Sequence, residues 1–157
     1  MTRSQALIEA VKLRLAAIQS ADGFATDSGD QVVQGPELID PTNSPGLVVQ
    51  SVLEEYTTPS GDAPASGPRS MLVRNTITIA SAITGDQADI GAEAEKQLGD
   101  IKRALCIGTH IADASGKKAT LELIRADKFP MVDGEQFEGV TVTIQCTYTE
   151  KWGDPDA

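Results

Sequence analysis

The chain has 157 residues, with 13 basic and 23 acidic side chains and a formal net charge of −10. This charge opposes sequence-independent DNA binding, which gains its affinity by neutralising phosphates. No apolar run approaches the roughly 18 residues of a membrane-spanning helix, and the two cysteines, Cys106 and Cys146, are too few for a disulfide framework or a metal site. We therefore expect a single domain over residues 1–157 without a membrane segment.

The first element is an amphipathic helix, predicted from about Ser4 to Ser20 by apolar residues three and four positions apart. Its buried stripe is Leu7, Ile8, Val11, Leu15 and Ile18. Ser4 is a plausible N-cap, and Asp22-Gly23 is a plausible stop. Four charged residues are expected to point to solvent: Arg3, Glu9, Lys12 and Arg14.

Two strands and a long polar segment follow. Residues 31–34 predict a short strand, the run from Asp40 to Pro45 is turn sequence, and Gly46 to Tyr56 predicts a longer strand. Residues 57–68 (TTPSGDAPASGP) contain no large apolar side chain with which to pack. This flexible segment is either a mobile hairpin tip or a loop that orders against a partner subunit.

Two strands carry the clearest pattern in the chain. In 140–149 every even position is apolar or aromatic and every odd position is Thr or Gln. In 73–83 the apolar residues Val73, Ile77, Ile79 and Ile83 fall on one face, whereas Arg74, Thr76 and Thr78 fall on the other. The pattern predicts a sheet with one face covered by the core and one polar face left free.

The remaining elements complete an α+β arrangement. A second helix is predicted from about Asp86 to Cys106, a connection over 107–116, a strand over 118–127 and a polar loop over 131–138. Asp113-Ala114-Ser115-Gly116 is ordinary turn sequence. We expect an α+β fold with two helices packed on one face of a mainly antiparallel four- to five-stranded sheet.

The residues that could support catalysis are sparse. His110 is the only histidine, so neither a Ser-His-Asp triad elsewhere nor a histidine-based metal site is possible; it is a lone general base or, more simply, a surface residue. No phosphate-binding glycine loop is present, and the acidic run at 133–138 is too short for a calcium loop. Carboxylates brought together by folding stay open as an alternative. We expect no enzymatic activity, no catalytic residue, no cofactor and no metal.

In the order of its elements and in its residue patterns, the chain resembles the tail terminator (tail-completion) proteins of long-tailed bacteriophages, the family of the lambda minor tail protein U. The resemblance covers nearly the whole chain except residues 57–68. The segments that carry it are SQALIEAVKLRLAAI, DSGDQVVQGPELIDP, SPGLVV, NTITIASAI, GDIKRALC and VTVTIQCTYTEKWGDP.

The resemblance implies a virion protein that forms a ring, typically a homohexamer, at the head-proximal end of the tail after assembly in the host cytoplasm. The ring halts growth of the tail tube protein and offers a docking surface to the head-completion or neck protein, while DNA passes through the lumen without specific binding. A head–tail connector or neck subunit of the same kind of virion is the alternative, and a small enzyme or ligand-binding module is a third reading.

For such a ring, eight residues are interface or lumen candidates: Tyr56, Arg74, Thr76, Thr78, Thr141, Thr143, Gln145 and Trp152. The Thr-rich face either pairs across subunits, lines a channel or is simply solvated, and Trp152 either caps the core edge or lies at an interface. Residues 15–68 contain no Lys or Arg but eight acidic residues. These form either a solvated acidic surface or a lumen wall that repels DNA.

Overall fold

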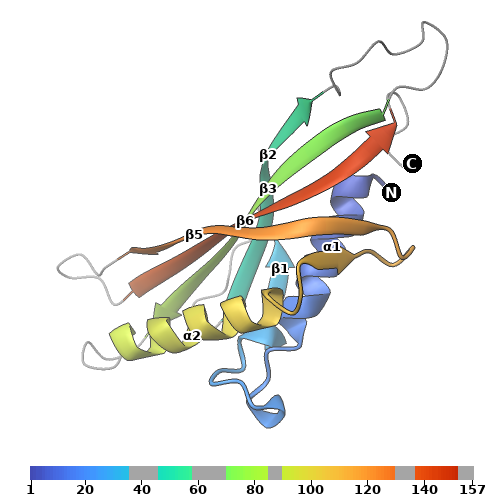
Figure 1. The fold of residues 1–157 in the computed structure, drawn as a ribbon. Coiled ribbons are helices and arrows are strands. Elements are labelled where there is room, and N and C mark those ends of the chain that lie inside the picture. Colours follow the sequence, from blue (N-terminus) through green and yellow to red (C-terminus); the bar gives the residue numbers. More distant parts are fainter. Residues whose placement is uncertain (36–45, 58–69, 85–89, 130–136, 152–157) are drawn as a thin grey trace, which may run out of the picture.

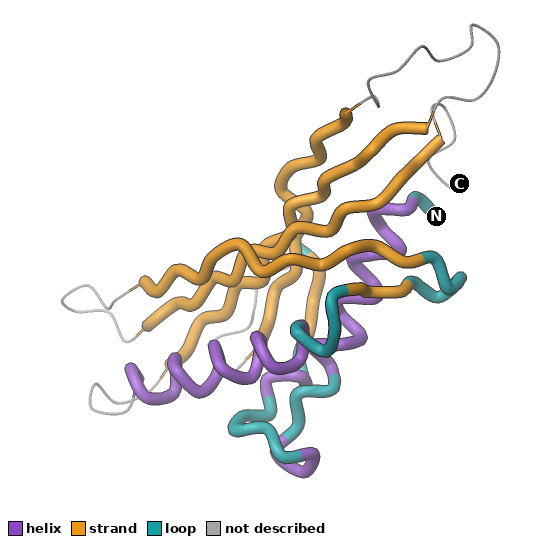
Figure 2. Tube along the Cα trace, viewed as in Figure 1, coloured by secondary structure: helices purple, strands orange, loops and turns teal. Residues whose placement is uncertain are grey.

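The computed structural model describes residues 1–35, 46–57, 70–84, 90–129 and 137–151. Its strands form one curved sheet (Figures 1 and 2). The helices are α1 (Arg3–Ala16) and α2 (Ile90–Leu105), with short 3-10 turns at Ser20–Asp22 and Ser28–Asp30. The strands are β1 (Val32–Gln34), β2 (Gly46–Thr57), β3 (Ser70–Thr84), β4 (His110–Ala112), β5 (Lys118–Phe129) and β6 (Phe137–Lys151).

The expected fold class is wrong. The fold is mainly sheet: six strands in the order β1-β2-β3-β6-β5-β4 form one mixed half-barrel, in which β1 runs parallel to β2 and the other pairs are antiparallel. The two helices do not form a layer over a four- to five-stranded antiparallel sheet. The additional strand, β4, has three residues within the predicted connection 107–116, too few for a periodic pattern to reveal it.

The half-barrel shape follows from two β-bulges that flank one row of residues across the sheet. Opposite residues on neighbouring strands form a row across the sheet: Ser51 on β2, Ile77 on β3, Ile144 on β6 and Leu123 on β5. The register shifts directly beside this row in both flanking strands, between Ser51 and Leu53 and between Leu123 and Arg125. Because a bulge bends its strand and increases the local twist, the two bulges account for the bend that the long strands share in Figure 1.

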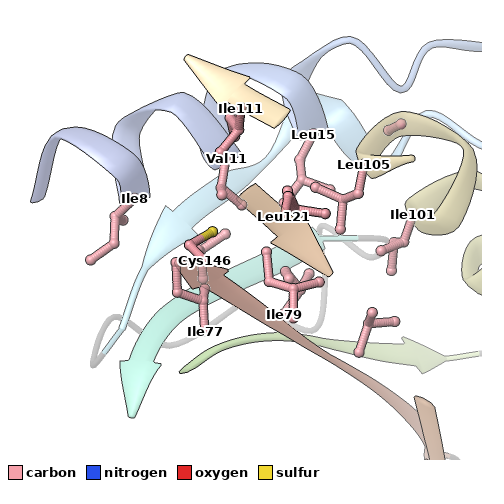
Figure 3. Close-up of a cluster of buried hydrophobic side chains, with 14 of the residues drawn as sticks. Ile8, Val11, Leu15, Ile77, Ile79, Ile101, Leu105, Ile111, Leu121 and Cys146 are labelled. Atoms are coloured by element: carbon pink, nitrogen blue, oxygen red, sulfur yellow. The ribbon is translucent and has the colours of Figure 1, made fainter. Parts of the chain in front are cut away.

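One hydrophobic core lies between the helices and the inner face of the sheet. Figure 3 shows Ile8, Val11 and Leu15 of α1 and Ile101 and Leu105 of α2 directed toward the strands. The strands contribute alternate residues, among them Val73, Ile77 and Ile79 of β3 and the even positions from 140 to 148 of β6. The alternation predicted for both strands is confirmed. The apolar stripe predicted for the first helix is buried, and α2 buries Ala94, Leu98, Ile101 and Leu105.

Helix α1 starts and stops at different residues from those predicted. Its N-cap is Thr2, whose hydroxyl accepts a hydrogen bond from the Gln5 amide at 3.2 Å, and not Ser4. The helix ends at Ala16, before the predicted Ser20. Ile18 is nevertheless fully buried, because the chain turns back after the helix. Gly23 follows the first 3-10 turn with a φ of 85°, a left-handed conformation that glycine adopts without strain.

Candidate interaction surface

The outer face of the sheet is a continuous polar surface built from β3 and β6. These strands are adjacent, and their register places Thr78 opposite Thr143, Thr76 opposite Gln145 and Arg74 opposite Thr147. Directly opposite residues point to the same face, so the sequence candidates Arg74, Thr76, Thr78, Thr141, Thr143 and Gln145 share one surface. The two Thr-rich rows that the sequence predicted separately therefore form a single polar face.

The flanking strands extend this face and add charges of both signs. Register places Gln50 and Arg125 beside the Thr78–Thr143 pair, and Leu53 and Glu122 beside the Thr76–Gln145 pair. A further row contains Glu55, Arg74, Thr147, Thr120 and His110. With Arg74 and Arg125 among Glu55, Glu122 and Asp127, the outer face carries mixed charge rather than the uniformly acidic character that we considered for a lumen wall.

Three of the sequence candidates do not add exposed area to this surface. Thr143 lies on it but is only 8% exposed. Tyr56 lies opposite Val73 and therefore on the inner side of the sheet, near the end of β2, where it is 55% exposed. Trp152 lies outside the described residues, as do residues 58–68 of the predicted flexible segment.

Tyr56 is held by a contact within its own strand. Its hydroxyl donates a hydrogen bond to Glu54 Oε2. This hydrogen bond, together with partial burial and the neighbouring negative charges of Glu54 and Glu150, raises the pKa of Tyr56 to about 12. The phenol therefore stays protonated at neutral pH and presents a neutral aromatic ring at the edge of the sheet.

Exposed apolar residues at the two bulges were missed in the sequence. Val52 and Leu53 of β2 are 51% and 52% exposed, and Leu123 and Ile124 of β5 are 38% and 51% exposed. In β5 the signal was present, because the doublet interrupts an alternating strand, which is typical of an inserted bulge residue. In β2 the apolar run 47–49 already breaks the alternation, so the doublet gives no clear signal there. Leu123 lies opposite the buried Ile144, but β5 is exposed from residue 122 to 126.

A buried ion pair fixes the start of α1 against the sheet. Arg3, expected in solvent, is 5% exposed and donates to Asp113 Oδ2 at 2.8 Å and to the Lys118 carbonyl at 3.0 Å. Its guanidinium also lies 5.6 Å from the centroid of the Tyr148 ring. Burial raises the pKa of Tyr148. The turn at Asp113 therefore helps to hold the start of α1 against the inner face of the sheet.

The groups capable of chemistry are dispersed over the molecule. His110 lies on β4, exposed, with Nδ1 2.9 Å from the Thr109 hydroxyl. Burial raises the pKa of Cys146 to about 12, so this thiol is not a nucleophile at neutral pH. Within the described ranges, no three His, Cys, Asp or Glu side chains are grouped as metal ligands. No described helix has the length and apolar character to cross a membrane.

Comparison with known proteins finds a similar fold among solved structures. No family model and no curated protein matches the chain. Among solved structures, a chain from the virion of a native gene transfer agent particle matches with a TM-score of 0.61 and 16% identity, covering 92% of this chain and 95% of that one. The two chains share a fold. A second solved chain, at 10% identity, covers 89% of this chain with a TM-score of 0.49, too low to carry an argument.

Proposed function

We propose that this chain is a structural subunit of a virion or phage-like particle. The observation that carries the proposal is the shared fold with a chain from a gene transfer agent virion, over almost the full length of both chains. The exposed apolar doublets and the long polar sheet face support it, because both are surfaces that subunit contacts can use. The described residues group no metal ligands that would favour a metal-dependent enzyme instead.

Within the particle, we assign the chain the role of a tail terminator. The sequence resemblance favours this role: a ring, typically a hexamer, would cap the tail tube, stop its polymerisation and offer its other face to the head-completion or neck protein. The ring would lie at the head-proximal end of the tail. A stacked tube does not close along its axis, so a capping subunit needs one face that fits the tube and another that admits no further tube subunit.

DNA would pass through such a ring without specific binding. The net charge of −10 supports this part of the proposal, because an acidic protein gains little from phosphate contacts. The mixed charge of the outer sheet face is consistent with a passage that neither holds nor strongly repels DNA.

Tube assembly provides the direct test. Purified tail tube protein is polymerised with and without this chain, and tube lengths are measured by electron microscopy, while native mass spectrometry gives the subunit number. A terminator shortens the tubes and is found at one end of them. Tubes of unchanged length, with the chain bound instead to portal or head-completion protein, would favour the alternative of a connector or neck subunit.

The polar face is tested separately. Alanine at Thr141, Thr143 and Gln145 should weaken ring formation or capping if this face lines a subunit contact, with Thr143 contributing least because it is nearly buried. Rings and capping that survive all three substitutions would mean that the face is only solvated.

A further inference from the structure

The described sheet has two edges that are only partly covered. β1 pairs with β2 at residues 47–49 alone, and β4 pairs with β5 at residues 118–120 alone. Among the strands that the structure describes, none pairs with the outer edge of β2 over 50–57 or with that of β5 over 122–129. Such edges carry N–H and C=O groups that can pair with another chain.

Exposed apolar side chains gather on these two edges. In the described part of the chain, the exposed large apolar residues are Met1, Leu13, Val52, Leu53, Tyr56, Ile107, Leu123 and Ile124. Five of these eight lie on the open stretches of β2 and β5. Bulges and charges are devices that protect a sheet edge, but here each bulge adds exposed apolar area to the edge, which favours contact with a partner.

The two apolar doublets lie beside the same cross-strand row of the sheet. Ser51 and Leu123 end the same cross-strand row, and the next row on one side ends in Gln50 and Arg125. Val52 follows this row on the side of Leu53, and Ile124 follows it on the side of Arg125, so the two bulge residues flank one row on opposite edges. The β2 and β5 edges are different surfaces, so a contact between them is head-to-tail, the type of contact that a ring of more than two copies requires.

Strand direction also fits a head-to-tail contact. β2, β3, β6 and β5 are joined by three successive antiparallel pairings, so β2 and β5 run in opposite directions. If copies are related by rotation about an axis along the strands, β5 of one copy runs antiparallel to β2 of the next. The contact continues the alternation that already exists inside the sheet.

The two edges carry net charges of opposite sign, which favours attraction between them. β2 contains Glu54 and Glu55 and no basic residue, a net charge of −2. β5 contains Lys118, Arg125 and Lys128 against Glu122 and Asp127, a net charge of +1. Arg125 is 69% exposed even though it pairs with Asp127. Glu122 is the exception, since it stands at the height of Leu53, next to the acidic pair.

We propose that the β2 edge of one copy contacts the β5 edge of the next, with the bulge at Val52 beside the bulge at Ile124, and that this contact closes the ring. The inference rests on the proposed function, which supplies the ring. It adds the surface, the partner and the head-to-tail direction of the contact.

Cross-linking in mixtures tests the direction. In a Cys106→Ser background, where Cys146 is buried, one chain carries Val52→Cys and a second carries Ile124→Cys. A short bis-maleimide should join the two chains in a mixture, while each chain alone gives no dimer. A dimer formed by either chain alone, or none in the mixture, would overturn the head-to-tail contact.

Charge insertion provides an independent test. Leu53→Lys and Ile124→Lys should each weaken assembly about tenfold or more, measured by native mass spectrometry across a concentration series. Leu13→Lys is the matched control, because Leu13 is 76% exposed on α1 and away from both edges; its assembly should be unchanged. Circular dichroism verifies that the three variants fold.

The two proposals fail differently. Rings that persist in both edge variants, with no cross-link in the mixture, overturn the edge contact and leave the terminator role intact. A native chain that assembles and cross-links as described but neither caps tubes nor alters their length overturns the terminator role and retains the edge contact.

Discussion

Arg3 and Asp113, 110 residues apart in the chain, form an ion pair with 2.8 Å between Nη1 and Oδ2 and side chains only 5% and 3% exposed. The pair joins the first residue of α1 to the turn between β4 and β5. Since Arg3 also reaches the Lys118 carbonyl and the Tyr148 ring, the start of the chain is fastened to both β5 and β6. The curved sheet thus depends on a charged contact as well as on its apolar core.

Arg3→Met should destabilise the fold strongly. The substitution leaves the Asp113 carboxylate buried without its counter-ion, and the expected loss in free energy of unfolding is about 3 kcal/mol, measured by urea denaturation. Lys12→Met is the matched control, because the Lys12–Glu9 pair is partly exposed, with side chains 26% and 45% exposed; its loss should stay under about 1 kcal/mol. Equal losses in both variants would contradict a special role for Arg3.

Lowering the pH should reduce the stability that the Asp113 carboxylate contributes to the fold. Burial raises its pKa, but hydrogen bonds from Ser115 and the Lys117 amide and the charge of Arg3 more than offset burial, so the pKa lies below its ordinary value. A lowered folded-state pKa contributes stability that is present above the unfolded pKa of about 3.8 and is lost as pH falls through the folded-state value. The difference in unfolding free energy between native chain and Asp113→Asn should therefore shrink from pH 7 toward pH 3. A difference independent of pH would contradict this account.

Two glycines should respond to alanine in opposite directions. A Cβ on Gly29 would lie 2.6 to 2.8 Å from the carbonyl oxygens of Ala16, Ile18 and Leu15, all backbone atoms that cannot easily move. Gly29→Ala should therefore lose about 1–3 kcal/mol of stability. A Cβ on Gly99, within α2, meets nothing within 4 Å, so Gly99→Ala should gain about 0.5–1 kcal/mol. Thermal unfolding of the two variants measures both effects.

Glu122→Lys should strengthen assembly if the β2 and β5 edges meet. The substitution removes the one acidic residue of β5 that would stand beside Glu54 and Glu55 of the neighbouring copy. Association in low salt should tighten about tenfold, and less so in high salt, where exposed charges are screened. Asp22→Lys makes the same charge change on an exposed residue away from both edges and should leave association nearly unaltered. Equal tightening by both substitutions would mean that only net charge matters.

The sequence predicted the elements better than their assembly. Alternation over 73–83 and 140–149 located β3 and β6 and their inner and outer faces, because a strand's period is local information. The mixed six-stranded half-barrel was not predictable in this way, since β4 is three residues long and the parallel pairing of β1 with β2 is a tertiary contact. Arg3 was misplaced for the same reason: its partner lies 110 residues away in a turn that looks ordinary.

Part of the candidate surface could nonetheless be predicted from the sequence. The Thr-rich rows were identified because polar residues recur at every second position. The doublets Val52-Leu53 and Leu123-Ile124 break that recurrence, and their exposure depends on which parts of the sheet the helices leave uncovered. Tyr56 was placed correctly near an edge but on the opposite side of the sheet from the Thr rows, because the bulge at Val52 reverses the phase of β2 beyond it.

The curvature of this sheet can change while its strand pairing stays the same, because the curvature comes from the two bulges. Ser51 and Leu53 already point to opposite faces, as do Leu123 and Arg125, so removing Val52 or Ile124 would leave an uninterrupted alternation with every other partner retained. A chain shortened by one residue at either position would keep its hydrogen-bonded ladder and straighten. Evolution or an engineer could thus adjust the radius of an assembly of such sheets by single-codon insertions and deletions, without redesigning the core.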